Sequence, residues 1–192
     1  MRGKVSVFLF GILALGTIGA IAAGGATAMA AAGAESVAPE PPAAGAPAPA
    51  FSLAGGDGQQ ASLKDFHGKW VVLYFYPKDF TGGCTLEAHN FQRDLAKYEQ
   101  MGAVIVGVSV DSAESHKSFC AKEGLAFKLL SDPEAATSTA YGSVMEYNGA
   151  KLSARNTFLI DPEGKIAKTF IGVKPAEHSD EVLAALTSLK KR

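Results

Sequence analysis

The stretch KWVVLYFYP at residues 69–77, followed directly by KDFTGGCTLEA at 78–88, decides how this chain folds. Its first half is an unbroken run of β-branched and aromatic residues, which is typical of a strand buried on both faces. Its second half is a glycine-containing loop that leads into a helical pattern over 84–100, with apolar residues at Leu86, Phe91, Leu95 and Tyr98. We therefore predict a buried strand, a loop and a helix in immediate succession.

Further elements on both sides of this stretch continue the alternation. Upstream, residues 50–66 are typical of a short hairpin around a Gly-Asp-Gly turn. Downstream, the pattern predicts strands at 103–110, 127–130, 156–161 and 165–172, and helices at Ser112–Gly124, Pro133–Tyr141 and Ser179–Lys190. This order predicts the α/β class: a thioredoxin-like fold in which a central, mostly parallel sheet is flanked by helices, with a short N-terminal hairpin.

The N-terminal segment is predicted not to belong to this fold. Two basic residues precede a long uncharged run that contains VFLFGILAL and ends near the small-residue pattern Ala28-Met29-Ala30. This is typical of a cleaved signal peptide over residues 1–30, with an uncleaved membrane anchor as the alternative. Residues 31–47 are predicted to form an Ala/Pro-rich linker before a folded domain at 48–192. A secreted or periplasmic location follows from the cleaved form.

The composition of the 192 residues narrows the class of function. Lys and Arg total 18 against 19 Asp and Glu, a formal net charge of −1, so the basic surface typical of nucleic-acid binding is absent. Two cysteines exclude a disulfide-rich scaffold and an all-cysteine zinc site. The four histidines show no metal-ligand spacing, so we expect surface or packing roles for them, and neither a cofactor nor a metal.

Cys84 is the residue around which we expect chemistry. It falls at the start of the predicted helix, where unpaired backbone N–H groups and the helix dipole stabilise a thiolate. Thr81 lies three residues upstream with a hydroxyl, and the N–H groups of Gly83 and Cys84 are donors for developing negative charge. Glu87 is expected to support the helix start or form an ion pair. Because ligand sites in open α/β sheets lie beyond the carboxyl ends of strands, this loop is the predicted site.

Two motifs give the chain a family resemblance. PKDFTGGCTLEA at 77–88 is similar to the peroxiredoxin motif, in which Pro, Thr and Cys recur at fixed spacing. RNTFLID at 155–161 is similar to the downstream arginine strand of that family. The chain resembles the bacterioferritin-comigratory or Q-type peroxiredoxins over residues 47–190.

The resemblance implies roles for four residues. Cys84 is similar to the peroxidatic cysteine and Thr81 to the hydroxyl that contacts the peroxide. Pro77 is similar to the ring that shields the pocket, and Arg155 to the guanidinium beside the thiolate. The implied activity is reduction of hydrogen peroxide and organic hydroperoxides, with a thioredoxin-like protein as reductant.

The sequence departs from the family pattern at two positions. The usual Thr-Pro-Gly-Cys has Gly82 in place of proline here, which removes one constraint on the loop. His89 occupies the position, five residues after the first cysteine, where many Q-type members carry the second. The resemblance to another subset of the family assigns the resolving role to Cys120, 36 positions after Cys84, with a buried structural cysteine as the alternative. A disulfide between these two helices would require local unwinding.

Two other classes of function are compatible with the sequence. One is a thioredoxin-like disulfide oxidoreductase or metallochaperone of the cell envelope, although neither CxxC nor CxxxC is present. The other is a non-catalytic domain with a permanent Cys84–Cys120 disulfide, which would need neither Thr81 nor Arg155. A one-cysteine peroxidase with Cys120 in the core is a variant of the leading hypothesis. We expect a monomer or a weak homodimer.

Overall fold

The computed structural model describes residues 39–191, so the predicted signal peptide lies outside the described residues. Within this range, no helix is long and apolar enough to cross a membrane. The elements, in chain order, are β1 (Ser52–Gly55), β2 (Gln60–Ser62), the 3-10 helix η1 (Leu63–Phe66), β3 (Trp70–Phe75), α1 (Gly82–Gln100), β4 (Ala103–Ser109), α2 (Ala113–Glu123), β5 (Lys128–Ser131), α3 (Ala136–Ala140), β6 (Val144–Tyr147), β7 (Ala150–Ser153), β8 (Asn156–Ile160), β9 (Ile166–Ile171) and α4 (His178–Leu189).

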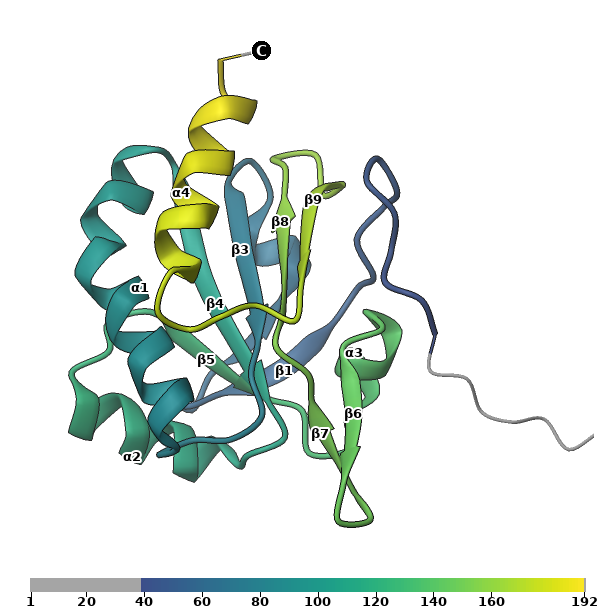
Figure 1. Cartoon of the computed structure of the whole chain (residues 1–192), viewed down its shortest axis with the longest axis vertical. Coiled ribbons are helices and arrows are strands. Elements are labelled where there is room, and N and C mark those ends of the chain that lie inside the picture. Colours follow the sequence, from purple (N-terminus) through teal and green to yellow (C-terminus); the bar gives the residue numbers. More distant parts are fainter. Residues whose placement is uncertain (1–38, 192) are drawn as a thin grey trace, which may run out of the picture. The chain divides into compact units, whose positions relative to one another are not determined.

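A seven-stranded sheet forms the centre of the fold, with the order β2-β1-β5-β4-β3-β8-β9 (Figure 1). The three central strands β5, β4 and β3 are parallel, as the alternation of strands and helices predicts. All other neighbouring pairs are antiparallel, so the sheet as a whole is mixed. The predicted N-terminal hairpin is β1–β2, and it joins the sheet where β1 pairs with β5.

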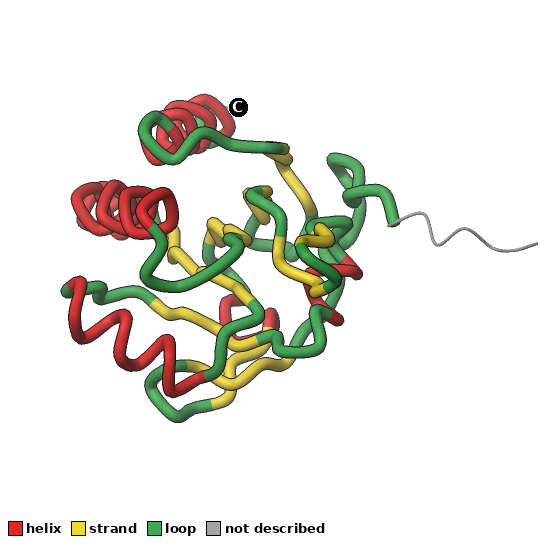
Figure 2. Tube along the Cα trace, turned by 60° about the horizontal axis from the view of Figure 1, so that its bottom comes forward, coloured by secondary structure: helices red, strands yellow, loops and turns green. Residues whose placement is uncertain are grey.

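The two faces of the sheet have separate cores. Val72, Tyr74 and Tyr76 of the β3 stretch pack with Phe91 and Phe119 on the face covered by α1, α2 and α4. Figure 2 shows these three long helices side by side on that face. The alternate β3 residues pack on the opposite face, with Phe158, Tyr141 and the η1 segment. Burial on both faces explains why β3 has no charged or amide residue. Leu86, by contrast, is 45% exposed, so the predicted apolar stripe of α1 begins only after it.

Part of the predicted linker belongs to the folded domain. The Gly45 N–H donates to the Ile166 carbonyl at 2.7 Å, and the Ala48 N–H donates to the Gly164 carbonyl at 2.9 Å. Pro47 and Lys165 form an isolated antiparallel bridge. The segment just before the predicted boundary at residue 48 therefore lies along the start of β9.

Two local features differ from the sequence expectation. The hairpin β6–β7 was not predicted, although its turn Asn148-Gly149 is typical of a hairpin, because its strands are only four residues long and mostly exposed. The helix predicted at Pro133–Tyr141 is shorter, since α3 begins only at Ala136. The Asp132 carboxylate accepts from the N–H groups of Thr137 at 3.1 Å and Ser138 at 2.7 Å, which ends the preceding turn and starts the helix there.

Candidate active site

The loop between β3 and α1 places Cys84 at the first turn of a helix. Thr81 is the N-cap residue of α1, and Cys84 is the third residue of the helix. The first bond of the helical ladder runs from the Thr85 N–H to the Thr81 carbonyl at 2.9 Å. The N–H groups of the preceding residues, including Gly83 and Cys84, belong to the first turn, where a helix has no acceptor of its own. These groups are available to an anion or a developing oxyanion, as predicted.

Arg155 contacts the Cys84 sulfur directly. Its Nη2 atom donates to Sγ at 3.2 Å, and the sulfur lies in a residue that is only 1% exposed. The sheet register explains this contact, because β8 pairs antiparallel with β3 and places Thr157 opposite Tyr74. Arg155, just before β8, therefore lies at the same end of the sheet as the loop after β3. The structure thus brings together two predicted residues that are 71 positions apart.

Glu87 completes this arrangement one turn after Cys84. Its Oε2 atom accepts from Arg155 Nη1 at 2.8 Å, while Oε1 is buried without a hydrogen-bond partner in the described part of the chain. Burial raises the pKa of Glu87 to about 7, and the nearby Arg155 opposes that rise. The ion pair expected for Glu87 is therefore present, and Arg155 is held between a carboxylate and the sulfur.

The two loop glycines differ in their surroundings. A Cβ atom on Gly83 would lie 2.9 Å from Arg155 Nη2, so the missing side chain allows the guanidinium to reach the sulfur. A Cβ atom on Gly82 would have no atom within 4 Å. A side chain at position 83 would therefore displace the tip of Arg155, whereas position 82 has room for a side chain.

Thr81 and Pro77 line the approach to the loop. The Thr81 hydroxyl donates to the Lys78 carbonyl at 3.0 Å, which leaves its lone pairs free to accept a hydrogen bond. Pro77 and Thr81 contribute to a cavity of about 530 Å³ whose other wall is the β6–β7 hairpin, with Met145, Tyr147 and Leu152. The unpredicted hairpin thus contributes an apolar wall beside the predicted loop.

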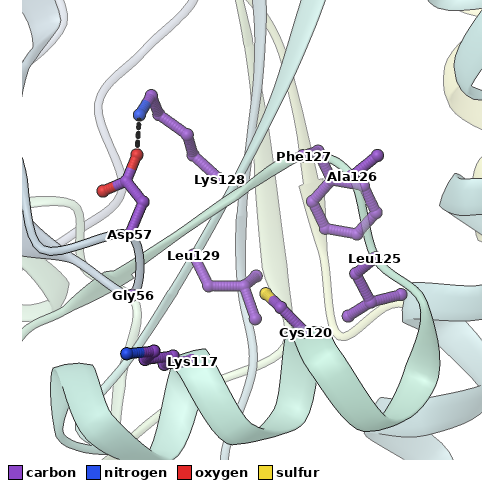
Figure 3. Close-up of a pocket in the computed structure, with 9 residues that line it drawn as sticks. All are labelled: Gly56, Asp57, Lys117, Cys120, Leu125, Ala126, Phe127, Lys128 and Leu129. Carbon is purple, nitrogen blue, oxygen red and sulfur yellow. Dashed lines mark hydrogen bonds and ion pairs between the residues drawn. The ribbon is translucent and has the colours of Figure 1, made fainter.

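Cys120 lies in a different environment. It is half-buried on α2, and both cysteines are free thiols. Its sulfur is directed toward a separate cavity of about 340 Å³ lined by β5 and by Gly56 and Asp57 (Figure 3). Burial raises the pKa of Cys120 to about 11, and the carboxylates of Asp79 and Asp57 add to the effect. Because both thiols are free, no disulfide joins Cys120 to Cys84 in the structure.

Sequence reasoning did not link one pair of residues near the site. His116 was expected in a surface or packing role, and its ring is fully buried with its Nδ1 2.9 Å from Asp79 Oδ2. Asp79 and His116 are 37 positions apart, and no local pattern links them. Among residues 39–191, no three His, Cys, Asp or Glu side chains are grouped in a way that suits a metal ion.

A buried cysteine at a helix start, held by an arginine beside a mixed central sheet, defines a thiol-based redox enzyme of the thioredoxin-like fold. The family model described as the AhpC/TSA family matches residues 44–169, and the chain therefore belongs to this family.

Relatives of known type agree with this assignment. The chain is 45% identical over 145 residues to Peroxiredoxin Bcp of Xanthomonas campestris, which covers 73% of this chain and 89% of the relative. It is 40% identical over 152 residues to Peroxiredoxin Bcp of Bacillus subtilis, covering 76% and 95%. A solved structure of Xanthomonas campestris Peroxiredoxin Q has a TM-score of 0.68 at 44% identity, covering 72% of this chain and 90% of that chain. The predicted family, fold and class of enzyme, a thiol peroxidase, are confirmed.

Proposed function

We propose that this chain reduces hydroperoxides with Cys84 as the nucleophile and Cys120 as the resolving cysteine. The observation that carries the first assignment is the 3.2 Å contact from Arg155 Nη2 to Cys84 Sγ at the start of α1. A guanidinium stays charged at all physiological pH values, so at this distance it stabilises a thiolate and its transition state.

The first step is attack of the Cys84 thiolate on the terminal oxygen of a hydroperoxide ROOH. The S–O bond forms as the O–O bond breaks, and the sulfur becomes a sulfenic acid that keeps the peroxide proton. The leaving RO⁻ takes a proton from water. Arg155 and the free N–H groups of the first turn of α1 stabilise the charge that moves onto the leaving oxygen, and the Thr81 hydroxyl accepts the peroxide O–H.

The second step joins the two cysteines. The Cys120 sulfur attacks the sulfenic sulfur, the S–S bond forms, the S–O bond breaks, and hydroxide leaves with the thiol proton as water. Solved structures of Xanthomonas campestris Peroxiredoxin Q include serine mutants of two cysteines whose numbers differ by 36. Cys84 and Cys120 have the same separation, which supports the assignment. A thioredoxin-like dithiol is the class of reductant that would restore both thiols.

Organic hydroperoxides are included among the proposed substrates. The mostly apolar cavity of about 530 Å³ that Pro77 and Thr81 line has room for the alkyl group of a hydroperoxide bound at Thr81. Alkyl peroxide reduction activity is attributed to the Xanthomonas campestris Bacterioferritin Comigratory Protein, which matches this chain with a TM-score of 0.68 at 43% identity.

Peroxide consumption with dithiothreitol tests this proposal in the wild type, Cys84→Ser and Cys120→Ser. Cys84→Ser should lose consumption entirely. Cys120→Ser should keep the first oxidation, accumulate sulfinic acid under excess peroxide and lose turnover with a thioredoxin-like reductant. A disulfide oxidoreductase would consume no peroxide even as the wild type, and a stable sulfenic acid in the wild type would make this a one-cysteine peroxidase.

A further inference from the structure

A buried polar cluster connects the active-site loop to α2, the helix that carries Cys120. At its centre the Asp79 carboxylate accepts from Tyr76 Oη at 2.7 Å, Ser115 Oγ at 2.7 Å and His116 Nδ1 at 2.9 Å. Tyr76 and Asp79 belong to the stretch between β3 and α1, whereas Ser115 and His116 lie on α2. We call these four residues the Asp79 cluster.

The carboxylate in this cluster is charged. Burial by itself would raise the pKa of Asp79, but the hydrogen bonds from His116 and Tyr76 lower it below its usual value. An ionised carboxylate only accepts, so His116 donates through Nδ1. Separation of α2 from the loop would therefore remove two donors, Ser115 and His116, from a buried negative charge.

A second contact fixes the same pair of segments. Phe80, the residue after Asp79, packs its ring edge-to-face on Phe119 of α2 with centroids 5.0 Å apart, and Lys122 Nζ lies 5.4 Å above the Phe80 ring. Phe80 has a φ of 59°, an unusual value for a bulky side chain. The loop backbone thus adopts a strained conformation that places Phe80 on α2, adjacent to the bonds made by Asp79.

Disulfide formation requires these contacts to open. Cys120 lies one helical turn after His116, its sulfur is directed toward the cavity beside β5 (Figure 3), and it is not bonded to Cys84. A disulfide needs the two Cα atoms within roughly 7 Å and the two sulfurs in contact. The part of α2 that carries Ser115, His116 and Cys120 must therefore leave its position before the sulfurs can meet.

We propose that Asp79, Ser115 and His116 are positioning residues that control how often α2 leaves the active-site loop, and so set the rate at which Cys120 resolves oxidised Cys84. The inference rests on the proposed function, because it takes Cys120 as the resolving cysteine. In the closed arrangement α2 is bound to the active-site loop, the loop is complete and Cys120 cannot reach Cys84. In the open arrangement α2 is released from the loop, the loop is incomplete and Cys120 can reach Cys84.

Ser115→Ala is the variant that tests this most cleanly. It removes one bond to Asp79 and leaves a residue that favours helix, so folding is preserved. Ser118→Ala is its matched control, because Ser118 lies on the exposed side of the same helix and donates only to the Glu114 carbonyl at 2.9 Å. The reduced proteins are mixed with one equivalent of hydrogen peroxide, quenched by alkylation and resolved by mass spectrometry into sulfenic acid and disulfide.

We expect Ser115→Ala to form the disulfide about tenfold faster than the wild type, because one hydrogen bond to a charged group shifts an equilibrium by roughly that factor. The first oxidation should stay within about twofold, since an open form rising from about 0.1% to about 1% leaves the closed form dominant. The peroxide concentration that converts half of Cys84 to sulfinic acid should rise in parallel. Ser118→Ala should match the wild type in all three measurements.

His116 supplies a second, larger test. His116→Ala should accelerate disulfide formation more than Ser115→Ala, and His116→Asn, which keeps a donor near the position of Nδ1, should restore much of the wild-type rate. If His116→Ala does not fold, Ser115→Ala decides alone. Equal disulfide rates in the wild type, Ser115→Ala and Ser118→Ala would overturn the inference while leaving the proposed function intact. Absence of any Cys84–Cys120 disulfide in the wild type would instead overturn the assignment of Cys120.

Discussion

The two cysteines of this chain lie on neighbouring helices and differ in almost every physical respect. Cys84 is in the first turn of α1, with free N–H groups around it and an arginine 3.2 Å from its sulfur. Cys120 is eight residues into α2, where the helix satisfies its backbone and where the nearby charges are the carboxylates of Asp79 and Asp57. Burial alone does not explain the difference, because Cys84 is the more buried of the two.

The comparison shows that position along a helix and the sign of the nearest charge decide what a thiol can do. Positive charge and unpaired donors stabilise the thiolate at Cys84. Burial and negative charge keep Cys120 protonated, with a pKa raised to about 11, so it is a poor nucleophile in the closed arrangement. One fold thus holds the two thiols, for which we propose the attacking and the resolving role, in separate electrostatic environments.

Arg155→Ala should reduce the difference in reactivity between Cys84 and Cys120 more than any other substitution considered. It removes the charge beside Cys84 and leaves Glu87 buried without a partner, so peroxide oxidation of Cys84 should slow by about 10² to 10³. Thr81→Val should slow it less, because it removes one acceptor and no charge. Stopped-flow oxidation of the reduced variants measures both, with alkylation of Cys120 as an internal reference that should not change. Near wild-type rates in both variants would place the peroxide site elsewhere.

Gly83→Ala should have an intermediate effect. The new Cβ atom would lie 2.9 Å from Arg155 Nη2, so the tip of the guanidinium must move away from the sulfur. Misplacement of a catalytic group by a fraction of an ångström costs roughly tenfold in rate, measured in the same stopped-flow experiment. Gly82→Ala is the matched control, because a Cβ atom there meets nothing within 4 Å. Equal rates for the two variants would contradict the close approach at Gly83.

Glu87→Gln should have the smallest effect on rate, since glutamine still accepts from Arg155, but it should change the pH dependence of stability. The pKa of Glu87 is about 7 in the folded chain and 4.5 ordinarily, so between these values the folded state keeps a proton that the unfolded state releases. The free energy of unfolding contributed by Glu87 therefore falls as pH rises from about 4.5 to about 7. Urea unfolding across this range should show that the free energy of unfolding of Glu87→Gln increases relative to that of the wild type as pH rises. If the free energy of unfolding depends on pH in the same way in the wild type and in Glu87→Gln, the pKa of Glu87 is not raised.

The sequence was sufficient for the centre of the fold and for the cysteine loop. The apolar run of β3 has no charged or amide residue, and such a run is typical of a strand buried on both faces. The loop that follows it carries a helix start, a cysteine and glycines within a few residues, so the local pattern already contains the chemistry. The position of Arg155 beside Cys84 was predicted through a family motif, and the antiparallel register of β8 with β3 explains why Arg155 lies near the cysteine loop.

The Asp79 cluster could not be predicted from local sequence patterns, whereas the β6–β7 hairpin was overlooked. Asp79 and His116 meet only because the end of β3 and the start of α2 lie at the same end of the sheet, and neither residue has a distinctive sequence context. The hairpin did leave a local signal, because Asn148-Gly149 is typical of a tight hairpin turn, and the structure has Asn148 at a φ of 51° and Gly149 at 76°. Contacts set by tertiary structure leave little trace in local periodicity.

The segment at residues 45–48 has a consequence for self-association. β9 is the last strand in the sheet order, and an open strand edge is a template on which a second chain can add a strand. Gly45, Ala46 and Ala48 occupy the beginning of that edge with backbone hydrogen bonds to Gly164 and Ile166, and Pro47 between them has no N–H to offer a newcomer. A chain trimmed to begin after residue 48 would lose this cover, and its open edge would favour self-association. Residues that the sequence pattern assigns to a linker therefore contribute to the solubility of the folded domain.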